Sequence, residues 1–473
     1  MSAHRLYFLA AATLLAGCAL KAPPAPDEVL QQALPTTPVP PAWQATSTAA
    51  PVATGWVQSF GDVQLDAIVA EAIAHNTDLR AAAARVEVAQ QAVVIAGAAM
   101  QPQVGAQFGA RRTYDDDSGS AGSATVAYLG VAWELDVWGR LRARADAAAY
   151  GAQAAALDYA WARESLAALV AKSWFLCIES RQLLALAEQS VSIYGDLLKL
   201  VNARRTAGKD TDLNVAVVTA KVETARSSVE AARRTYGEAK RALETLLGRY
   251  PSAEIAIAPV FGGLPGPSGA SLPSALLERR ADIVAAERVV LAAFRQQESA
   301  ELALLPSFGV SLDAGRFGDI VTSLLRLNPW LASAAIGMSV PIYEGGALQA
   351  QVSIATARQA QAVASYGGVV LKAFREVEDS LANESLLAAQ LPLDERSLQA
   401  RTEAVRIGTQ QFVAGRQDLL WVAQLQAEQI AAESNLIKVH AAQRANRIRL
   451  YQALGGGYGS APEAGPQARA VPG

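Results

Sequence analysis

The sequence predicts a mainly α-helical, internally duplicated protein that also carries β-strands of the transmembrane barrel type. Three observations lead to this fold class: two long stretches align with each other, four short segments alternate apolar and polar residues, and the remaining segments are long and rich in alanine. Of 473 residues, 51% are hydrophobic but only 6% are aromatic. This balance suits closely packed helices better than a thick globular core, which would bury larger side chains.

The composition excludes several classes of protein. A formal net charge of -3 leaves no basic footprint for nucleic acid. Three histidines and two cysteines nearly exclude Cys/His metal sites and a disulfide framework. His75 and His440 fall in helical segments, Gly455-Gly-Gly457 follows a helix and lacks a phosphate-binding lysine, and Asp115-Asp116-Asp117-Ser-Gly119 lacks the distal glutamate of a calcium loop. We therefore predict no catalytic residues, no metal and no cofactor, and hence no enzyme.

The N-terminus is typical of a bacterial secretion signal. A short basic start and an apolar stretch end in Leu15-Ala16-Gly17-Cys18, which resembles a lipobox. This resemblance makes residues 1–17 a signal peptide and Cys18 the lipidated first residue, with N-acyl (palmitate) and S-diacylglycerol groups. Ala19 follows in place of the aspartate that retains lipoproteins in the inner membrane, so the resemblance implies outer-membrane sorting. The alternative is an ordinary signal peptide with an accidental cysteine.

The rest of the chain is a tether followed by two copies of one unit. Residues 18–60 are rich in proline, alanine and threonine and are expected to form an extended tether. Residues 61–256 and 272–457 form two copies, whose matching segments are offset by 204 early in each copy and by 207 later, which indicates an internal duplication. The Gly/Pro-rich residues 257–271 are the expected linker, and residues 458–473 a flexible tail.

Each copy has the same order of elements: a helix, two strands around a loop, a very long helix, a glycine turn and a last helix. The expected helices cover residues 64–101, 140–206 and 213–248, then 272–305, 345–414 and 420–454. The expected strands cover residues 104–113 and 125–137, then 307–315 and 332–342. Their alternation and length suit transmembrane strands, although a soluble hairpin packed on a core would alternate in the same way. Pro392 predicts a kink or break in the second long helix.

Neither the strands nor the helices are complete by themselves. Four strands cannot close a barrel, so two, three or four chains would have to share one. Helices this long need neighbours along their whole length. An apolar seam with a 3.5-residue period predicts left-handed supercoiling; it comprises Val215, Val218, Val222, Ala225, Val229, Ala232, Tyr236, Ala239, Leu243 and Leu246.

Several segments of this sequence resemble the TolC family of outer-membrane factors, in its lipoprotein branch (OprM- and NodT-like). The segments are Leu15-Ala-Gly-Cys18, Phe60-Gly-Asp-Val-Gln-Leu65-Asp66, Trp133-Glu-Leu-Asp-Val-Trp-Gly-Arg-Leu141, Gly263-Leu-Pro, Leu272-Pro-Ser-Ala-Leu-Leu-Glu-Arg-Arg280-Ala-Asp-Ile283, Pro341-Ile-Tyr-Glu-Gly-Gly346 and Tyr451-Gln-Ala-Leu-Gly-Gly-Gly457. The resemblance implies a homotrimer that forms a twelve-stranded barrel in outer-membrane lipid and a twelve-helix barrel across the periplasm. It further implies an exit duct for small molecules that docks on a periplasmic adaptor (membrane fusion) protein and an inner-membrane pump of the RND type.

The resemblance places the periplasmic gate and the adaptor contacts at two hairpin turns, residues 207–214 and 414–421. The candidate residues are the charged Arg204, Lys209, Asp210, Asp212, Arg416 and Asp418 and the apolar Leu213 and Leu420. Opposite charges there would hold a closed state, each exposed pair contributing about 0–1 kcal/mol. The simpler interpretation is a pair of solvated turns in which Asp210 or Asp212 is a helix N-cap. Asn214 and Trp421 stand where many relatives carry aspartate, so the resemblance does not extend to a carboxylate ring at these positions.

Two alternatives to an efflux duct remain open from the sequence. One is a structural coiled-coil outer-membrane lipoprotein without a pore, and the other is a type I secretion duct for proteins. Conductance in a planar bilayer separates a pore from a protein without one. The exported substrate is not encoded in this chain, because the duct accepts what the pump delivers.

Overall fold

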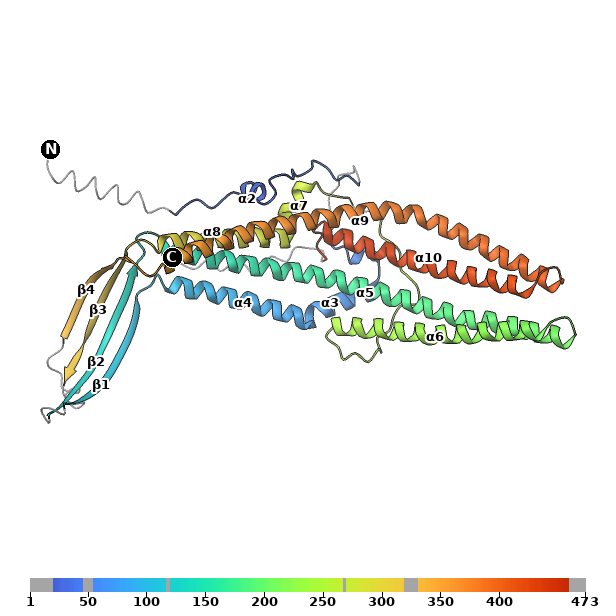
Figure 1. Cartoon of the computed structure of the whole chain (residues 1–473), viewed down its shortest axis with the longest axis horizontal. Coiled ribbons are helices and arrows are strands. Elements are labelled where there is room, and N and C mark those ends of the chain that lie inside the picture. Colours follow the sequence, from blue (N-terminus) through green and yellow to red (C-terminus); the bar gives the residue numbers. More distant parts are fainter. Residues whose placement is uncertain (1–19, 46–53, 116–119, 267–268, 319–330, 459–473) are drawn as a thin grey trace. The chain divides into compact units, whose positions relative to one another are not determined.

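The computed structural model describes residues 20–45, 54–115, 120–266, 269–318 and 331–458 (Figure 1). The expected signal peptide, the lipidation residue Cys18 and nearly all of the expected tail lie outside the described residues. The chain divides into two compact units, each assembled from segments far apart in sequence. The first unit comprises Met1–Pro38, Ala84–Leu157 and Ile283–Val369, and the second comprises Val39–Ala83, Asp158–Asp282 and Val370–Gly473.

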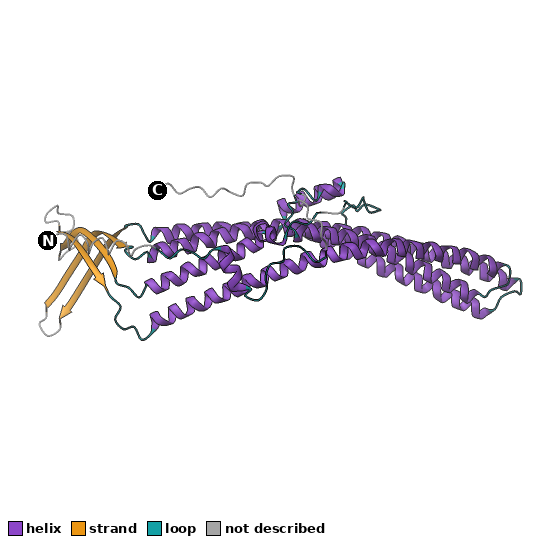
Figure 2. Ribbon diagram, turned by 90° about the horizontal axis from the view of Figure 1, so that it is seen from above, coloured by secondary structure: helices purple, strands orange, loops and turns teal. Residues whose placement is uncertain are grey.

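The first unit contains a four-stranded antiparallel sheet, drawn in orange in Figure 2. Its strand order is β1-β2-β3-β4. The strands are β1 (Gln103–Asp115), β2 (Ser120–Leu135), β3 (Ser307–Gly318) and β4 (Leu331–Ser339). The register pairs Val131 with both Val104 and Leu312, whereas Gly130 pairs with Gly105 and Asp313. Since side chains alternate across a sheet, one face is apolar and the other polar. All four predicted strands are thereby confirmed.

Two strands end earlier than the alternation predicted, each for a local reason. β2 ends at Leu135 because the Asp136 carboxylate caps the next helix, where it accepts hydrogen bonds from the backbone N–H groups of Leu141 and Arg142, each at 2.9 Å. β4 ends at Ser339, two residues before Pro341, which has no N–H to donate to a ladder.

Long helices make up most of the rest of both units. The helices of the first copy are α3 (Val63–His75), α4 (Thr77–Ala98), α5 (Arg140–Thr206) and α6 (Asp212–Leu246). Those of the second copy are α7 (Pro273–Arg279), α8 (Ala281–Leu302), α9 (Ala347–Val413) and α10 (Leu419–Ala453). The four longest match their predicted bounds within two residues. In the part of the chain that the structure describes, no helix combines the length and the apolar character needed to cross a membrane.

The predicted single helices 64–101 and 272–305 are wrong, because each is two helices. The breaks fall at Asn76 and Arg280, which adopt extended backbone with ψ of 130° and 117°. The two positions are equivalent at the offset of 204. Asn76 starts α4 by accepting a hydrogen bond from the Leu79 N–H at 2.9 Å. No glycine or proline marks either break, which is why the apolar pattern reads as continuous.

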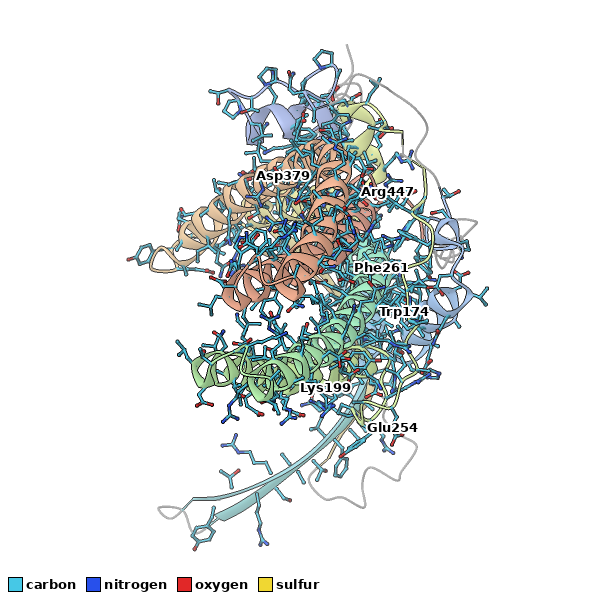
Figure 3. The ribbon with its side chains drawn as sticks, turned by 90° about the vertical axis from the view of Figure 1, so that its right-hand side faces the viewer. Trp174, Lys199, Glu254, Phe261, Asp379 and Arg447 are labelled. Carbon is cyan, nitrogen blue, oxygen red and sulfur yellow. The ribbon has the colours of Figure 1, made fainter. Side chains whose placement is uncertain are left out.

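The core of the second unit is built from α3, α5, the ends of α6 and α10, and the segments that flank them. Trp174 (Figure 3) and Phe175 of α5 are fully buried. The Trp174 indole N–H donates to Asp62 at 2.8 Å. Phe175 packs against Phe60 with ring centroids 5.2 Å apart. Alanines complete the contact surfaces and permit the close approach of helices that the composition predicted.

The linker between the copies is held by two arginines of α10. Arg444 donates to the carbonyl of Gly262, and Arg447 (Figure 3) donates to the carbonyls of Pro265 and Gly266. Arg447 is only 2% exposed and pairs with Glu384 of α9. The linker has no regular secondary structure here, and the two arginine side chains donate the hydrogen bonds that its backbone carbonyls need.

The extended tether predicted for residues 18–60 is wrong in part. In the first unit, Pro26–Ala33 forms the helix α2, because proline begins a helix favourably and Asp27 and Glu28 complement its N-terminal dipole. In the second unit, Gln58–Phe60 forms a short helix, and Trp43 packs against Phe374 with ring centroids 5.9 Å apart. Both parts of the segment therefore lie against helices.

At Pro392 the sequence predicted a kink or a break, and the break does not occur, because α9 continues through the proline. The kink stays a prediction. Proline removes one backbone donor and clashes with the preceding turn, which costs about 3 kcal/mol. The helix extends far on both sides of the proline, as Ala347–Val413, so this cost does not end it. The expected flexible tail begins one residue too early, since Tyr458 accepts a hydrogen bond from Arg163 at 2.6 Å through its hydroxyl.

Candidate functional site at the hairpin tips

Two helical hairpins of the second unit, α5–α6 and α9–α10, end in turns with the same backbone. Gly208 and Gly415 occupy the left-handed region, with φ of 68° and 73°. The next residues, Lys209 and Arg416, donate their N–H groups to the carbonyls of Arg204 and Gln411 at 2.8 and 2.9 Å. These bonds close the C-terminal turns of α5 and α9. Glycine is required at both positions because only it adopts this φ without strain.

The turn of the first hairpin contains a buried carboxylate, Asp210, whose side chain is 3% exposed. Its oxygens accept hydrogen bonds from the Thr211 N–H at 2.9 Å and the Asn214 amide at 2.6 Å. The Arg204 guanidinium lies 3.5 Å away and supplies the opposite charge. A charge removed from water needs such a partner, so this pair is a structural element of the turn and not a solvated contact.

Arg204 also connects the first hairpin to the second. It donates to the backbone carbonyl of Phe412 in α9 at 3.3 Å. Its guanidinium carbon lies 4.5 Å from the centroid of the Phe412 ring, which is a cation–π contact. One side chain therefore joins the turn of α5–α6 to the last turn of α9.

A hydrophobic cluster beneath Arg204 packs the two hairpins together. It draws residues from all four helices: Tyr194, Leu197, Val201, Val218, Val222, Ala225, Phe412, Leu419, Val422 and Ala423. Three of these, Val218, Val222 and Ala225, belong to the predicted supercoil seam and are buried. The seam therefore faces the second hairpin as well as α5.

The other predicted site residues lie more openly. Asp212 pairs with Arg205 at 2.5 Å, but the two side chains are 83% and 53% exposed. Lys209 and Arg416 are exposed, as are Leu213 (69%) and Leu420 (51%). Asp418 is the N-cap of α10 and accepts a hydrogen bond from the Trp421 N–H at 2.8 Å. Within one chain, then, the structure unites Arg204 with Asp210 and leaves the other predicted residues on the surface.

Sequence reasoning missed four contributors to this region. The N-cap of α6 is Thr211, neither Asp210 nor Asp212. Asn214, Phe412 and Trp421 were not predicted as contacts, yet Asn214 bonds Asp210 and Phe412 receives Arg204. Trp421 packs against Gly408, where an added Cβ would lie 3.1 Å from the indole. A glycine inside a long helix was the available signal for such a close approach.

Burial shifts the pKa of two ionisable side chains elsewhere in the second unit. Burial raises the pKa of the Cys177 thiol to about 12, which makes it an inert core residue. Burial also lowers the pKa of His440. Among the described residues, no group of three or more His, Cys, Asp or Glu side chains is placed to hold a metal ion.

Duplicated strand pairs and long helical hairpins define the class of protein as a TolC-like channel of the bacterial outer membrane. The chain belongs to the outer membrane efflux protein family, whose family model matches residues 68–249 and 272–456. These two matches correspond to the two copies in the sequence. The family consists of transporters, and this protein is accordingly an outer membrane efflux channel of a Gram-negative bacterium that extends into the periplasm.

Curated relatives resemble the chain over most of its length. It is 31% identical to the pyoverdine export outer membrane protein OpmQ of Pseudomonas aeruginosa, with 86% of this chain and 88% of the relative covered. It is 27% identical to the cation efflux system protein CusC of Escherichia coli, with 85% and 88% covered. Similarity to the toluene efflux pump outer membrane protein TtgF of Pseudomonas putida is 28% identity, with 85% of each covered.

Solved structures show the same fold. A crystal structure of CusC superimposes with a TM-score of 0.78 at 24% identity, covering 89% of this chain and 99% of that one. The Campylobacter jejuni CmeC outer membrane channel gives 0.82 at 18% identity, with 94% and 95% covered. A membrane protein from Pseudomonas aeruginosa gives 0.78 at 27% identity, with 87% and 100% covered.

Proposed function

We propose that three copies of this chain form the exit duct of a tripartite efflux system, gated at the hairpin tips. The sheet supports the shared duct, because its outer strands β1 and β4 have no further partner within the four-stranded sheet. Open edges are not tolerated in lipid, so strands of neighbouring copies must satisfy them. β4 is exposed along its whole length, which is expected of an edge strand that pairs with a strand of another copy.

The tips are the proposed contact for a periplasmic adaptor protein, which in turn joins an inner-membrane pump of the RND type. Leu213, Val413, Leu420 and Trp421 expose between 42% and 69% of their surface at the two turns. Apolar side chains gathered at the end of a hairpin favour a protein partner. Arg416 and Lys209 stand beside them and would orient an acidic partner.

The proposed cargo is small molecules, delivered by the pump. The relatives named for pyoverdine, toluene and cations are nearly equally similar to this chain, at 31%, 28% and 27% identity. Such similarity across unlike cargoes supports a duct that does not choose its substrate.

One observation carries the gating proposal, and that is the position of Arg204. Opening a pore lined by hairpins requires neighbouring hairpins to separate. Arg204 opposes this separation through the Asp210 ion pair, the Phe412 carbonyl and the Phe412 ring. Contacts of this kind contribute on the order of 1–3 kcal/mol together, enough to hold a resting state and weak enough for a docked adaptor to overcome.

The experiment is conductance of the purified protein in a planar bilayer. Wild-type protein should give small, rarely open channels, and Arg204→Ala should give a several-fold larger mean conductance. Arg226→Ala is the matched control, since Arg226 pairs with Glu223 on the exposed surface of α6. Equal conductance in all three proteins would contradict the gate, and the absence of channels in all three would contradict the duct.

The proposal includes a lipid anchor on Cys18, supported by the signal-like sequence before it. An N-acyl and S-diacylglycerol cysteine adds hydrocarbon chains that each favour the membrane by about 0.8 kcal/mol per buried methylene. Intact mass measurement of the mature protein tests this point independently of conductance. An unmodified residue 18 would contradict it.

A further inference from the structure

The segment that follows Cys18 is held by a buried ion pair of α8, in the first unit. The backbone N–H of Lys21 donates to Glu298 at 2.6 Å, and its carbonyl accepts from Arg295 at 2.9 Å. The backbone N–H and the backbone carbonyl of Lys21 are thus both hydrogen-bonded, one to Glu298 and the other to Arg295. Arg295 and Glu298 are 7% and 4% exposed and bond each other at 2.5 Å.

Two features show that this site fits the segment closely. Gly139 has φ of 87°, and an added Cβ there would lie 2.7 Å from the Leu20 side chain. Glycine therefore leaves the space that Leu20 occupies. The Asp146 carboxylate forms an ion pair with the Arg295 Nε at 3.4 Å. The exposed ammonium of Lys21 makes a separate bond to Glu301 at 2.6 Å.

From these contacts we infer that Arg295, Glu298 and Gly139 form a clasp that fixes the lipid anchor to the base of the sheet. The inference rests on the lipidation of Cys18 proposed above. Three residue steps separate Cys18 from Lys21, so the anchor lies within about 11 Å of the clasp. The acyl chains must therefore enter the membrane within about 11 Å of the clasp. The lipid is attached to the folded protein by a short segment and not by a long flexible tether.

The surroundings of the clasp suit the membrane–water boundary. Trp138 immediately precedes Gly139, and its indole N–H donates to the Pro306 carbonyl at 2.7 Å. Trp133, near the end of β2 on the apolar face, donates to the Met100 carbonyl at 2.9 Å. Tryptophans with an apolar ring and a bonded N–H concentrate at this boundary. The clasp and Trp138 are therefore neighbours in the first unit, because Gly139 belongs to the clasp.

Limited proteolysis of the full-length protein, purified from membranes in detergent, tests the clasp. Trypsin cuts after lysine, and cleavage between Lys21 and Ala22 requires the segment to leave the clasp. Wild-type protein should resist, and Glu298→Gln should release the acylated Cys18–Lys21 peptide about tenfold faster, since it loses a charge-assisted hydrogen bond. Glutamine matches glutamate in size, so the packing of α8 is retained.

Two internal references keep the result decisive. Glu301→Gln removes only the acceptor for the exposed ammonium and should leave the cleavage rate within about twofold of wild type. Cleavage at Arg205 and Lys209 of the first hairpin turn should be equal in all variants if they are folded alike.

Two outcomes would overturn the clasp while lipidation stands: wild-type protein cut as fast as Glu298→Gln, or Glu301→Gln cut equally fast, with an acylated Cys18 in the released peptide. A released peptide without acyl groups would instead refute the lipid anchor itself. Mass spectrometry of the released peptide separates the two failures.

Discussion

The two copies of the repeat share their backbone contacts but not the side chains that make them. At the tips, Gly208 and Gly415 close identical turns. In the first copy the turn carries the Arg204–Asp210 pair, whereas the equivalent positions of the second copy are Gln411 and Gln417. Only the first turn has a buried ion pair, and that pair reaches across to the second hairpin through Phe412.

The helix breaks repeat the same lesson. Asn76 donates its amide to the carbonyl of Leu246 at 3.0 Å, and the equivalent Arg280 donates to the carbonyl of Ala453, the equivalent of Leu246, at 3.4 Å. Arg280 further binds Asp282 and Glu376 at 2.7 Å and lies 4.6 Å from the Trp161 ring. The two copies thus break the helix at the same position. A neutral side chain, Asn76, makes the hydrogen bond at the break in the first copy, and a charged one, Arg280, makes it in the second.

The largest effect is expected at the charged break. Arg280 is 1% exposed, and Arg280→Ala would remove a buried cation that pairs with Asp282 and Glu376, at a cost of about 3–5 kcal/mol. Asn76→Ala should cost only about 1–2 kcal/mol, since it loses a neutral cap. Amide hydrogen exchange at the start of α8 and of α4 measures both. Equal costs would mean that the charge adds nothing to the duplicated contact.

The second largest effect is expected in the pH dependence of stability, which a residue of the first copy alone should cause. Burial raises the pKa of Glu164 from 4.5 to about 7, and the equivalent residue of the second copy is Leu371. The folded protein holds the proton of Glu164 more tightly than the unfolded chain does. Protonation of Glu164 therefore stabilises the folded state fully below about pH 4.5, and this stabilisation is lost as the pH rises through 7.

Wild-type protein should therefore lose about 1–3 kcal/mol relative to Glu164→Gln between about pH 5 and pH 8. The glutamine keeps an acceptor for the Tyr458 N–H, which bonds Glu164 at 3.0 Å, but it does not titrate. Denaturant unfolding of both proteins at several pH values measures the difference. Parallel pH profiles would show that Glu164 titrates at its ordinary pKa.

The smallest effect is expected at the two helix caps. Thr211 and Asp418 are equivalent N-caps, and alanine at either position should cost about 1 kcal/mol. The carboxylate also favours the helix dipole, so the Asp418→Ala cost should fall with added salt and the Thr211→Ala cost should not. Hydrogen exchange in the first turns of α6 and α10 at low and high salt makes this comparison. The same salt dependence at both caps would refute the distinction.

The strands and the hairpin turns could be predicted from local sequence patterns. The contacts between residues far apart in the sequence could not. Alternation located all four strands, and the glycines at 208 and 415 located the hairpin turns. The breaks at Asn76 and Arg280 depend on carbonyls that lie 170 and 173 residues away, which no local pattern reports. Likewise Arg204 was predicted as a tip charge, but its contact with Phe412 crosses 208 residues.

The central claim is that the first hairpin, and not the second, holds the tips together through Arg204. The direct test is the double variant Arg204→Gln with Asp210→Gln, which gives the first turn the side chains of the second. Its mean conductance in a planar bilayer should be several-fold above that of wild type. Conductance equal to wild type, from a protein that is folded and inserts normally, would contradict the claim.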